Sequence, residues 1–81
     1  MNWNLQLCRM HPPVELVEAY ALEAGKKAHQ DGRARSPSID PECRRLVCEQ
    51  APNHPGTIMR AWLRGWDQED FRELAAAMRE T

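Results

Sequence analysis

Apolar residues recur at helical spacing early in this chain of 81 residues. At about 100° per residue they share one helix face, and Glu15 and Glu23 lie opposite. This pattern predicts a helix from about residue 13 to 31, with Gly32 as the left-handed residue that follows its last turn. The positions on the apolar face are Val14, Val17, Tyr20, Ala21, Ala24, Gly25 and Ala28.

The last part of the chain predicts a second long helix over about 57–80, with Thr57 as a candidate N-cap. Its apolar positions form two stripes that differ by about 140° around the helix axis. We therefore expect a bend near residue 66, where Gly65 and Asp67 stand. The first stripe is Ile58, Met59, Trp62, Leu63 and Trp66, and the second is Phe71, Leu74, Ala75 and Met78.

Two shorter elements complete the predicted fold. Asp40 can cap a short helix over about 41–50, with Leu46 and Val47 facing inward. Alternation of apolar and polar residues predicts a strand over 3–7, which needs a partner because one strand cannot satisfy its backbone alone. The sequence thus predicts a single all-α domain spanning 1–81, a small bundle of two long helices and a short one. Residues 1–12 are a strand or tail.

The small residues of the first helix predict how the two long helices pack. Glycine inside a helix costs about 1 kcal/mol relative to alanine, so Gly25 indicates close approach of a bulky group. We expect Trp62 and Trp66 to pack over the small face that contains Ala24, Gly25 and Ala28. The alternative is that these indoles are exposed in a basic groove and stack on nucleobases.

Charge is distributed unevenly, although the chain carries a net charge of only −1. Residues 1–25 carry −2, residues 26–64 carry +4 and residues 65–81 carry −3. A basic middle segment can bind an anionic partner, or it can be a solvated surface whose two signs attract each other. The cations of this segment are Lys26, Lys27, Arg33, Arg35, Arg44, Arg45, Arg60 and Arg64.

Catalytic and metal-binding patterns are weak. Cys8, His11, Cys43 and Cys48 are zinc-compatible ligands, but Cys43 and Cys48 are five apart and point in different directions on a helix. Neighbouring acids such as Glu69 and Asp70 lie in a charged run that we expect to be solvated. We expect no enzyme activity, no metal and no cofactor. A cytoplasmic location is expected because no membrane span or secretory signal is recognised.

Two stretches resemble the ribosome modulation factor family. The first combines Gly25, Ala28, Gly32 and Arg33, and the second is Arg60-x-Trp62-Leu63-x-Gly65-Trp66. The resemblance covers residues 19–66. It implies a helical scaffold that binds the small ribosomal subunit and ribosomal RNA and regulates translation. The segment 43–56 is an insertion relative to the family, and the chain lacks the family's strongly basic character.

Three functions follow as hypotheses. The resemblance implies association with ribosomes or RNA through the eight cations of the basic middle segment. The near-neutral charge instead favours a phage or mobile-element protein that inhibits a bacterial host protein. In that case Trp3, Leu5 and Leu7 form an interface to a partner sheet or to a second copy in a homodimer. A drug-modifying enzyme is the third hypothesis, because relatives in the family are reported to have such activity.

Overall fold

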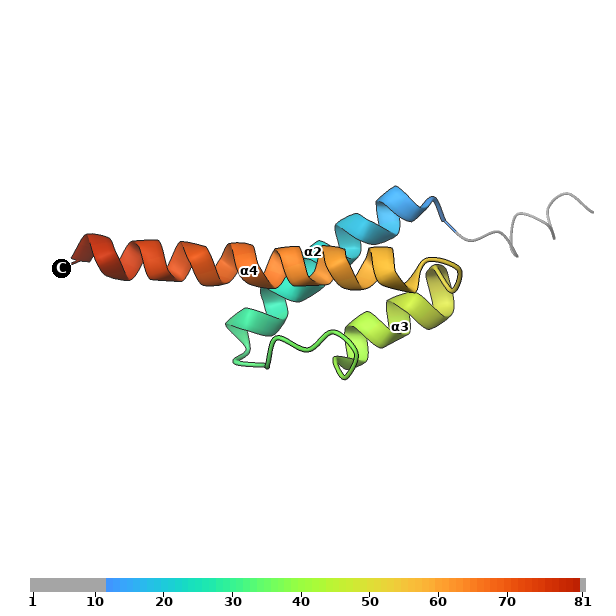
Figure 1. Cartoon of the computed structure of the whole chain (residues 1–81), viewed down its shortest axis with the longest axis horizontal. Helices are drawn as coiled ribbons and strands as arrows, with labels where there is room; N and C mark the ends of the chain where they lie inside the picture. The colour runs from blue at the N-terminus through green and yellow to red at the C-terminus, as the bar shows by residue number, and fades with distance from the viewer. Residues whose placement is uncertain (1–11, 81) are drawn as a thin grey trace, which may run out of the picture.

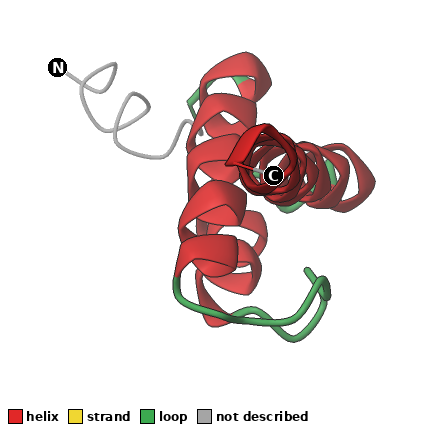
Figure 2. Cartoon of the chain, turned by 90° about the vertical axis from the view of Figure 1, so that its left-hand side faces the viewer, coloured by secondary structure: helices red, strands yellow, loops and turns green. Residues whose placement is uncertain are grey.

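The computed structural model describes residues 12–80, which contain three helices joined by loops. They are α2 (Val14–Gln30), α3 (Pro41–Gln50) and α4 (Pro55–Glu80). Helix α4 crosses α2, and the shorter α3 lies beside both (Figure 1, Figure 2). The all-α prediction is confirmed, whereas the predicted strand over 3–7 lies outside the described residues.

Helix α2 ends as its sequence predicts. Gly32 has a φ of 78°, in the left-handed region that glycine adopts without strain. Its N–H donates to the carbonyl of His29 at 3.0 Å, and the N–H of Arg33 donates to the carbonyl of Ala28 at 2.8 Å. These two bonds form a Schellman motif, which satisfies carbonyls at the helix end and turns the chain toward α3.

The remaining helix starts follow from local chemistry. Asp40 caps α3, since its carboxylate accepts a hydrogen bond from the Cys43 N–H at 2.9 Å. Helix α4 begins at Pro55, which suits a first helical position, and the N–H of Ile58 donates to the carbonyl of His54 at 3.1 Å. The prediction that Thr57 caps this helix was therefore wrong, because the helix starts two residues earlier.

The bend predicted near Trp66 is absent. Helix α4 continues through Gly65 and Asp67 as one element of 26 residues, and Figure 1 shows it as a straight rod. The change of apolar stripe has a different cause: α4 extends past the end of α2, so its second stripe no longer faces the core. Phe71, Leu74 and Met78 are 71%, 57% and 68% exposed.

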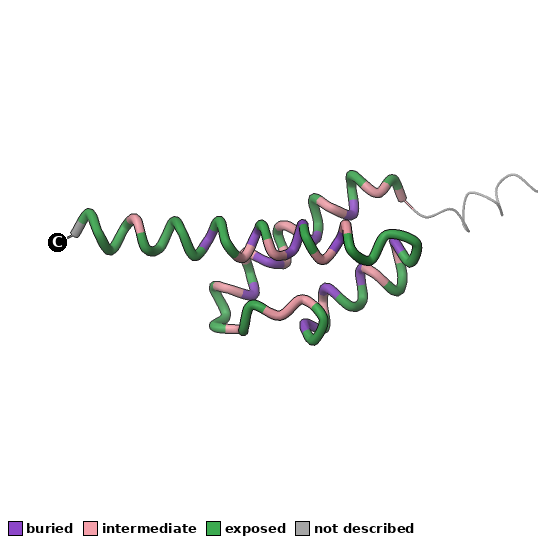
Figure 3. The backbone as a smooth tube through the Cα atoms, in the orientation of Figure 1, coloured by how far each residue is buried: buried purple, intermediate pink, exposed green. Residues whose placement is uncertain are grey.

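The core lies where the three helices meet. Its buried residues are Val17, Ala21, Ala28, Cys43, Leu46, Ala51, Ile58, Ala61 and Trp62. Trp62 has no exposed surface and is the largest fully buried side chain. Figure 3 shows buried positions concentrated around the crossing of α2 and α4, while the C-terminal part of α4 is almost entirely exposed.

Two glycines make the crossing of α2 and α4 close. A Cβ added to Gly25 would overlap the carbonyl oxygen of Trp62 and lie 2.9 Å from the backbone nitrogen of Trp66. A Cβ added to Gly65 would overlap the carbonyl oxygen of Leu22. Gly25 therefore lies against the backbone of α4 rather than under an indole ring. Close approach at Gly25 was predicted, and the matching role of Gly65 was not.

Candidate functional site

The basic middle segment is largely neutralised by the protein's own carboxylates. Six of its eight cations form ion pairs: Lys26 with Glu23, Lys27 with Asp31, Arg33 with Asp31 and Asp40, Arg35 with Asp67, Arg45 with Glu42 and Glu49, and Arg64 with Glu18. Within residues 12–80, Arg44 and Arg60 have no carboxylate partner, and they lie on different helices. The eight cations therefore do not form one free basic surface.

Arg33 and Arg35 form ion pairs that connect separate elements of the fold. The Arg33 guanidinium reaches the N-cap carboxylate of α3, with 3.1 Å between Nη1 and Asp40 Oδ1. Arg35 donates two hydrogen bonds to Asp67 at 2.7 and 2.8 Å, a bidentate pair that joins the loop after α2 to α4. These hydrogen bonds lower the pKa of Asp67. Both side chains thus have structural partners that a phosphate ligand would have to displace.

The two indoles differ in their burial. Trp62 is fully buried, and Trp66 is half-buried with its Nε1 donating to the carbonyl of Arg33 at 3.0 Å. The His29 ring meets Trp66 edge-on at a centroid distance of 4.5 Å. Trp62 lies in the buried core and Trp66 packs against it, but the small face at Gly25 meets the backbone of these residues rather than their rings. Stacking on nucleobases is excluded for Trp62 because its ring is inaccessible.

His29 and Glu69 lie at the end of the contact between α2 and α4. Nε2 of His29 lies 2.9 Å from Asp70 Oδ1, and Nδ1 lies 2.8 Å from Glu73 Oε2. Glu69, expected to be solvated, is only 5% exposed because it lies on the face of α4 that Trp62 and Trp66 share. Its carboxylate pairs with the exposed Arg72 at 3.2 Å.

Past Asp70, α4 carries an apolar stripe whose large side chains are mostly exposed. We call residues 71–80 the α4 extension, and its stripe is Phe71, Leu74, Ala75 and Met78. The spacing i, i+3, i+4 and i+7 places the four side chains on one face. Sequence reasoning found this stripe and interpreted the change of helix face as a bend near residue 66.

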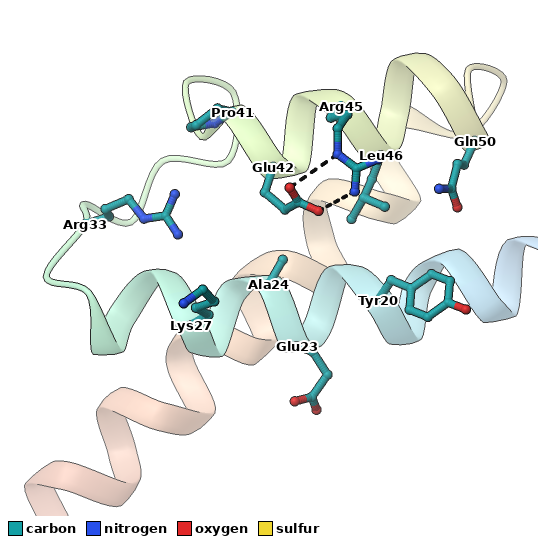
Figure 4. Close-up of a pocket in the computed structure, with 10 residues that line it drawn as sticks. All are labelled: Tyr20, Glu23, Ala24, Lys27, Arg33, Pro41, Glu42, Arg45, Leu46 and Gln50. Atoms are coloured by element: carbon teal, nitrogen blue, oxygen red, sulfur yellow. Dashed lines mark hydrogen bonds and ion pairs between the residues drawn. The ribbon is translucent and has the colours of Figure 1, made fainter.

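An open groove lies between α2 and α3. It encloses about 850 Å³ and has apolar lining from Ala24, Leu46 and Pro41. In Figure 4 Ala24 and Leu46 face each other across it, Lys27 and Arg33 lie toward one end, and Glu23 points away. Tyr20 was expected on the buried face of α2 but is 49% exposed, because it lines this open groove. The remaining lining residues are Glu42, Arg45 and Gln50.

The cysteines of α3 differ in accessibility. Cys43 is fully buried, and burial raises the pKa of its thiol to about 11, whereas Cys48 is exposed. Residues 12–80 contain no group of three or more histidine, cysteine, aspartate and glutamate side chains placed to hold a metal. The other two zinc candidates, Cys8 and His11, lie outside the described residues.

Alkylation should separate these two thiols. We expect iodoacetamide at pH 8 to modify Cys48 in the folded protein and to leave Cys43 unmodified, because thiolate and access are both needed for reaction. Peptide mass mapping after a short pulse measures this, and labelling in denaturant, where both thiols react, is the control. Equal labelling of both residues in the folded protein would contradict the burial of Cys43.

No helix within residues 12–80 is long and apolar enough to cross a membrane. Comparison with known proteins found no matching family model, no matching curated protein and no matching solved structure.

Proposed function

We propose that this chain is a non-catalytic regulatory protein that acts by binding another protein through the α4 extension. The observation that carries this proposal is the exposed apolar stripe on a helix that projects from the body of the domain. A helix with anchors at i, i+3, i+4 and i+7 is a common way to occupy a hydrophobic groove in a partner. A bacterial host protein is the partner class that we propose.

The chemistry of the extension fits this role. The other residues of the extension are the charged Arg72, Glu73, Arg79 and Glu80 and the small Ala76 and Ala77, so the stripe supplies its large apolar contact area. Large apolar side chains at the centre of an interface supply most of its binding energy. The scaffold positions this element rigidly, since His29 and Arg35 fasten α4 to the end of α2 and to the following loop.

Association with RNA or ribosomes is a second candidate function. It is favoured by Arg44 and Arg60, which have no carboxylate partner among the described residues, and by Arg64, whose pair with Glu18 is 4.0 Å long. Membership of the ribosome modulation factor family is part of this second proposal. Binding of this kind weakens steeply as salt rises, because each phosphate contact releases counterions.

Affinity capture with matched variants distinguishes the two functions. We expect the wild-type chain to retain one protein partner from a bacterial lysate after nuclease treatment. Leu74→Asp should reduce its recovery at least about tenfold, since truncation at an interface hot spot costs 2 kcal/mol or more. Ala76→Asp places the same charge on the opposite side of α4 and is the control. A partner that disappears with nuclease, or that survives in Leu74→Asp, would contradict the proposal.

A further inference from the structure

Two arginines lie on the same face of α4 as the apolar stripe. At about 100° per residue, Arg64, Phe71 and Leu74 all lie within about 40° of the direction of Arg60 around the helix axis. Helix α4 runs through the four positions as one element, which Figure 1 shows as a straight rod. At 1.5 Å per residue the surface extends about 21 Å from Arg60 to Leu74. We call these four residues the α4 face.

The α4 face is a continuous exposed surface. All four of its side chains are exposed. A surface hollow of about 370 Å³ joins its two halves, since Arg64 and Phe71 both line it. The remaining lining comes from Asp67 and Gln68. A partner that covers the apolar stripe therefore also reaches the arginines.

The arginines of the α4 face are weakly neutralised within the domain. Arg60 has no carboxylate partner within residues 12–80, and the pair between Arg64 Nη2 and Glu18 Oε2 is 4.0 Å long. The carboxylate in the hollow, that of Asp67, already accepts two hydrogen bonds from Arg35. The face therefore combines a positive end with an apolar end.

The other acidic residues of this part of α4 are engaged elsewhere. Asp70 and Glu73 contact His29 at the end of α2. Glu69 pairs with Arg72. By helical geometry Glu69 and Glu73 lie on the opposite side of the helix from the α4 face. The positive charge of the face is thus not cancelled by its neighbours along the helix.

We propose that the α4 face binds a protein whose apolar groove is bordered at one end by carboxylates. The groove takes Phe71 and Leu74, and the carboxylates pair with Arg60 and Arg64, so the acidic end of the groove lies toward the start of α4. This inference rests on the proposed function, because it specifies the partner's chemistry and its orientation on the same stripe. Complementary charges speed association and fix the register of two surfaces.

A protein groove matches both ends of the α4 face, whereas a nucleic acid matches one. Guanidinium groups bind carboxylates and phosphates alike. A phosphodiester backbone offers no apolar cavity for an aliphatic side chain such as Leu74, and stacking on bases uses aromatic side chains or arginine. The apolar end of the face therefore favours a protein as the partner of the cationic end.

Charge reversal tests the cationic end. The double variant Arg60→Glu with Arg64→Glu should recover at least about fivefold less of the nuclease-resistant partner at about 0.05 M salt, and about 0.5 M salt should reduce the difference because it screens exposed charges. Arg44→Glu changes an exposed cation of α3 and is the control. Circular dichroism verifies that each variant is folded. Wild-type recovery by the double variant, with loss in Leu74→Asp, would overturn the inference and leave the proposed function standing. Recovery that does not depend on Leu74 would contradict the proposed function itself.

Zero-length cross-linking tests the partner's carboxylates directly. Arg64→Lys keeps the positive charge and introduces an amine that a water-soluble carbodiimide couples to a carboxylate in direct contact. In a nuclease-treated lysate this variant should form a covalent product with an Asp or Glu of the partner, located by peptide mass mapping. Adding Leu74→Asp should lower its yield at least about tenfold. Arg44→Lys is the control for lysines elsewhere. Absence of the product, or an equal yield from Arg44→Lys, would overturn the inference.

Discussion

Replacing Gly65 with alanine is expected to destabilise the domain by at least about 3 kcal/mol, the upper part of the range for overpacked sites. The new Cβ would overlap the carbonyl oxygen of Leu22. Backbone atoms cannot rotate away as a side chain can, so α2 and α4 must separate along their whole contact. A domain of this size has a total stability of about 4–12 kcal/mol, so this loss leaves much of the protein unfolded.

Urea unfolding followed by far-UV circular dichroism measures the effect. Gly25→Ala should behave like Gly65→Ala, since it causes the reciprocal overlap with the carbonyl oxygen of Trp62. Gly56→Ala is the matched control: its Cβ would lie 3.4 Å from the end of the flexible Arg60 side chain. Alanine there should be neutral or stabilise the helix by up to about 1 kcal/mol. Equal stability of Gly65→Ala and Gly56→Ala would contradict the close backbone contact between α2 and α4.

Truncation of Trp62 to alanine is expected to have the second large effect, a loss of about 3–5 kcal/mol. The indole is fully buried among residues of all three helices, so its removal leaves a cavity at the point where they meet. The indole Nε1 has no hydrogen-bond partner within residues 12–80, so nearly all of the loss comes from apolar packing. The midpoint of urea unfolding, followed by circular dichroism at 222 nm, reports it.

Phe71→Ala provides the comparison on the same helix. Phe71 is 71% exposed, and its truncation should change the free energy of unfolding by less than about 0.5 kcal/mol. The same substitution should weaken binding through the α4 extension. A large loss of stability in Phe71→Ala would show that the second stripe packs within the domain and would contradict its assignment as a binding surface.

Elements governed by neighbouring residues were predicted well. The end of α2 at Gly32, the cap at Asp40 and the buried apolar positions of α2 follow from backbone conformation, hydrogen bonding and periodicity within a few residues. Gly25 was informative for a similar reason. A costly glycine inside a helix indicates close approach even when the approaching group is unknown.

Features that depend on two distant segments were missed or misread. The second stripe of α4 was taken as a sign of a bend, because periodicity cannot tell whether a neighbouring element is long enough to reach it. Glu69 lies in a charged run and is nevertheless buried, since its helix face points toward α2. Tyr20 is exposed because it faces the open groove between α2 and α3. The pairing of Arg35 with Asp67 spans 32 residues and has no sequence signature.

Local patterns in the amino-acid order were sufficient to establish that the chain is helical, where two of its helices end or begin, and that α2 tolerates a very close neighbour. These properties depend on bonds and steric limits within about one helical turn. The placement and extent of the packed helices decide three other properties. These are which cations remain free, which apolar stripe remains exposed and where a groove opens. These properties exist only after α2, α3 and α4 have packed together, because the exposed surface of each helix is the part that the other two helices leave uncovered.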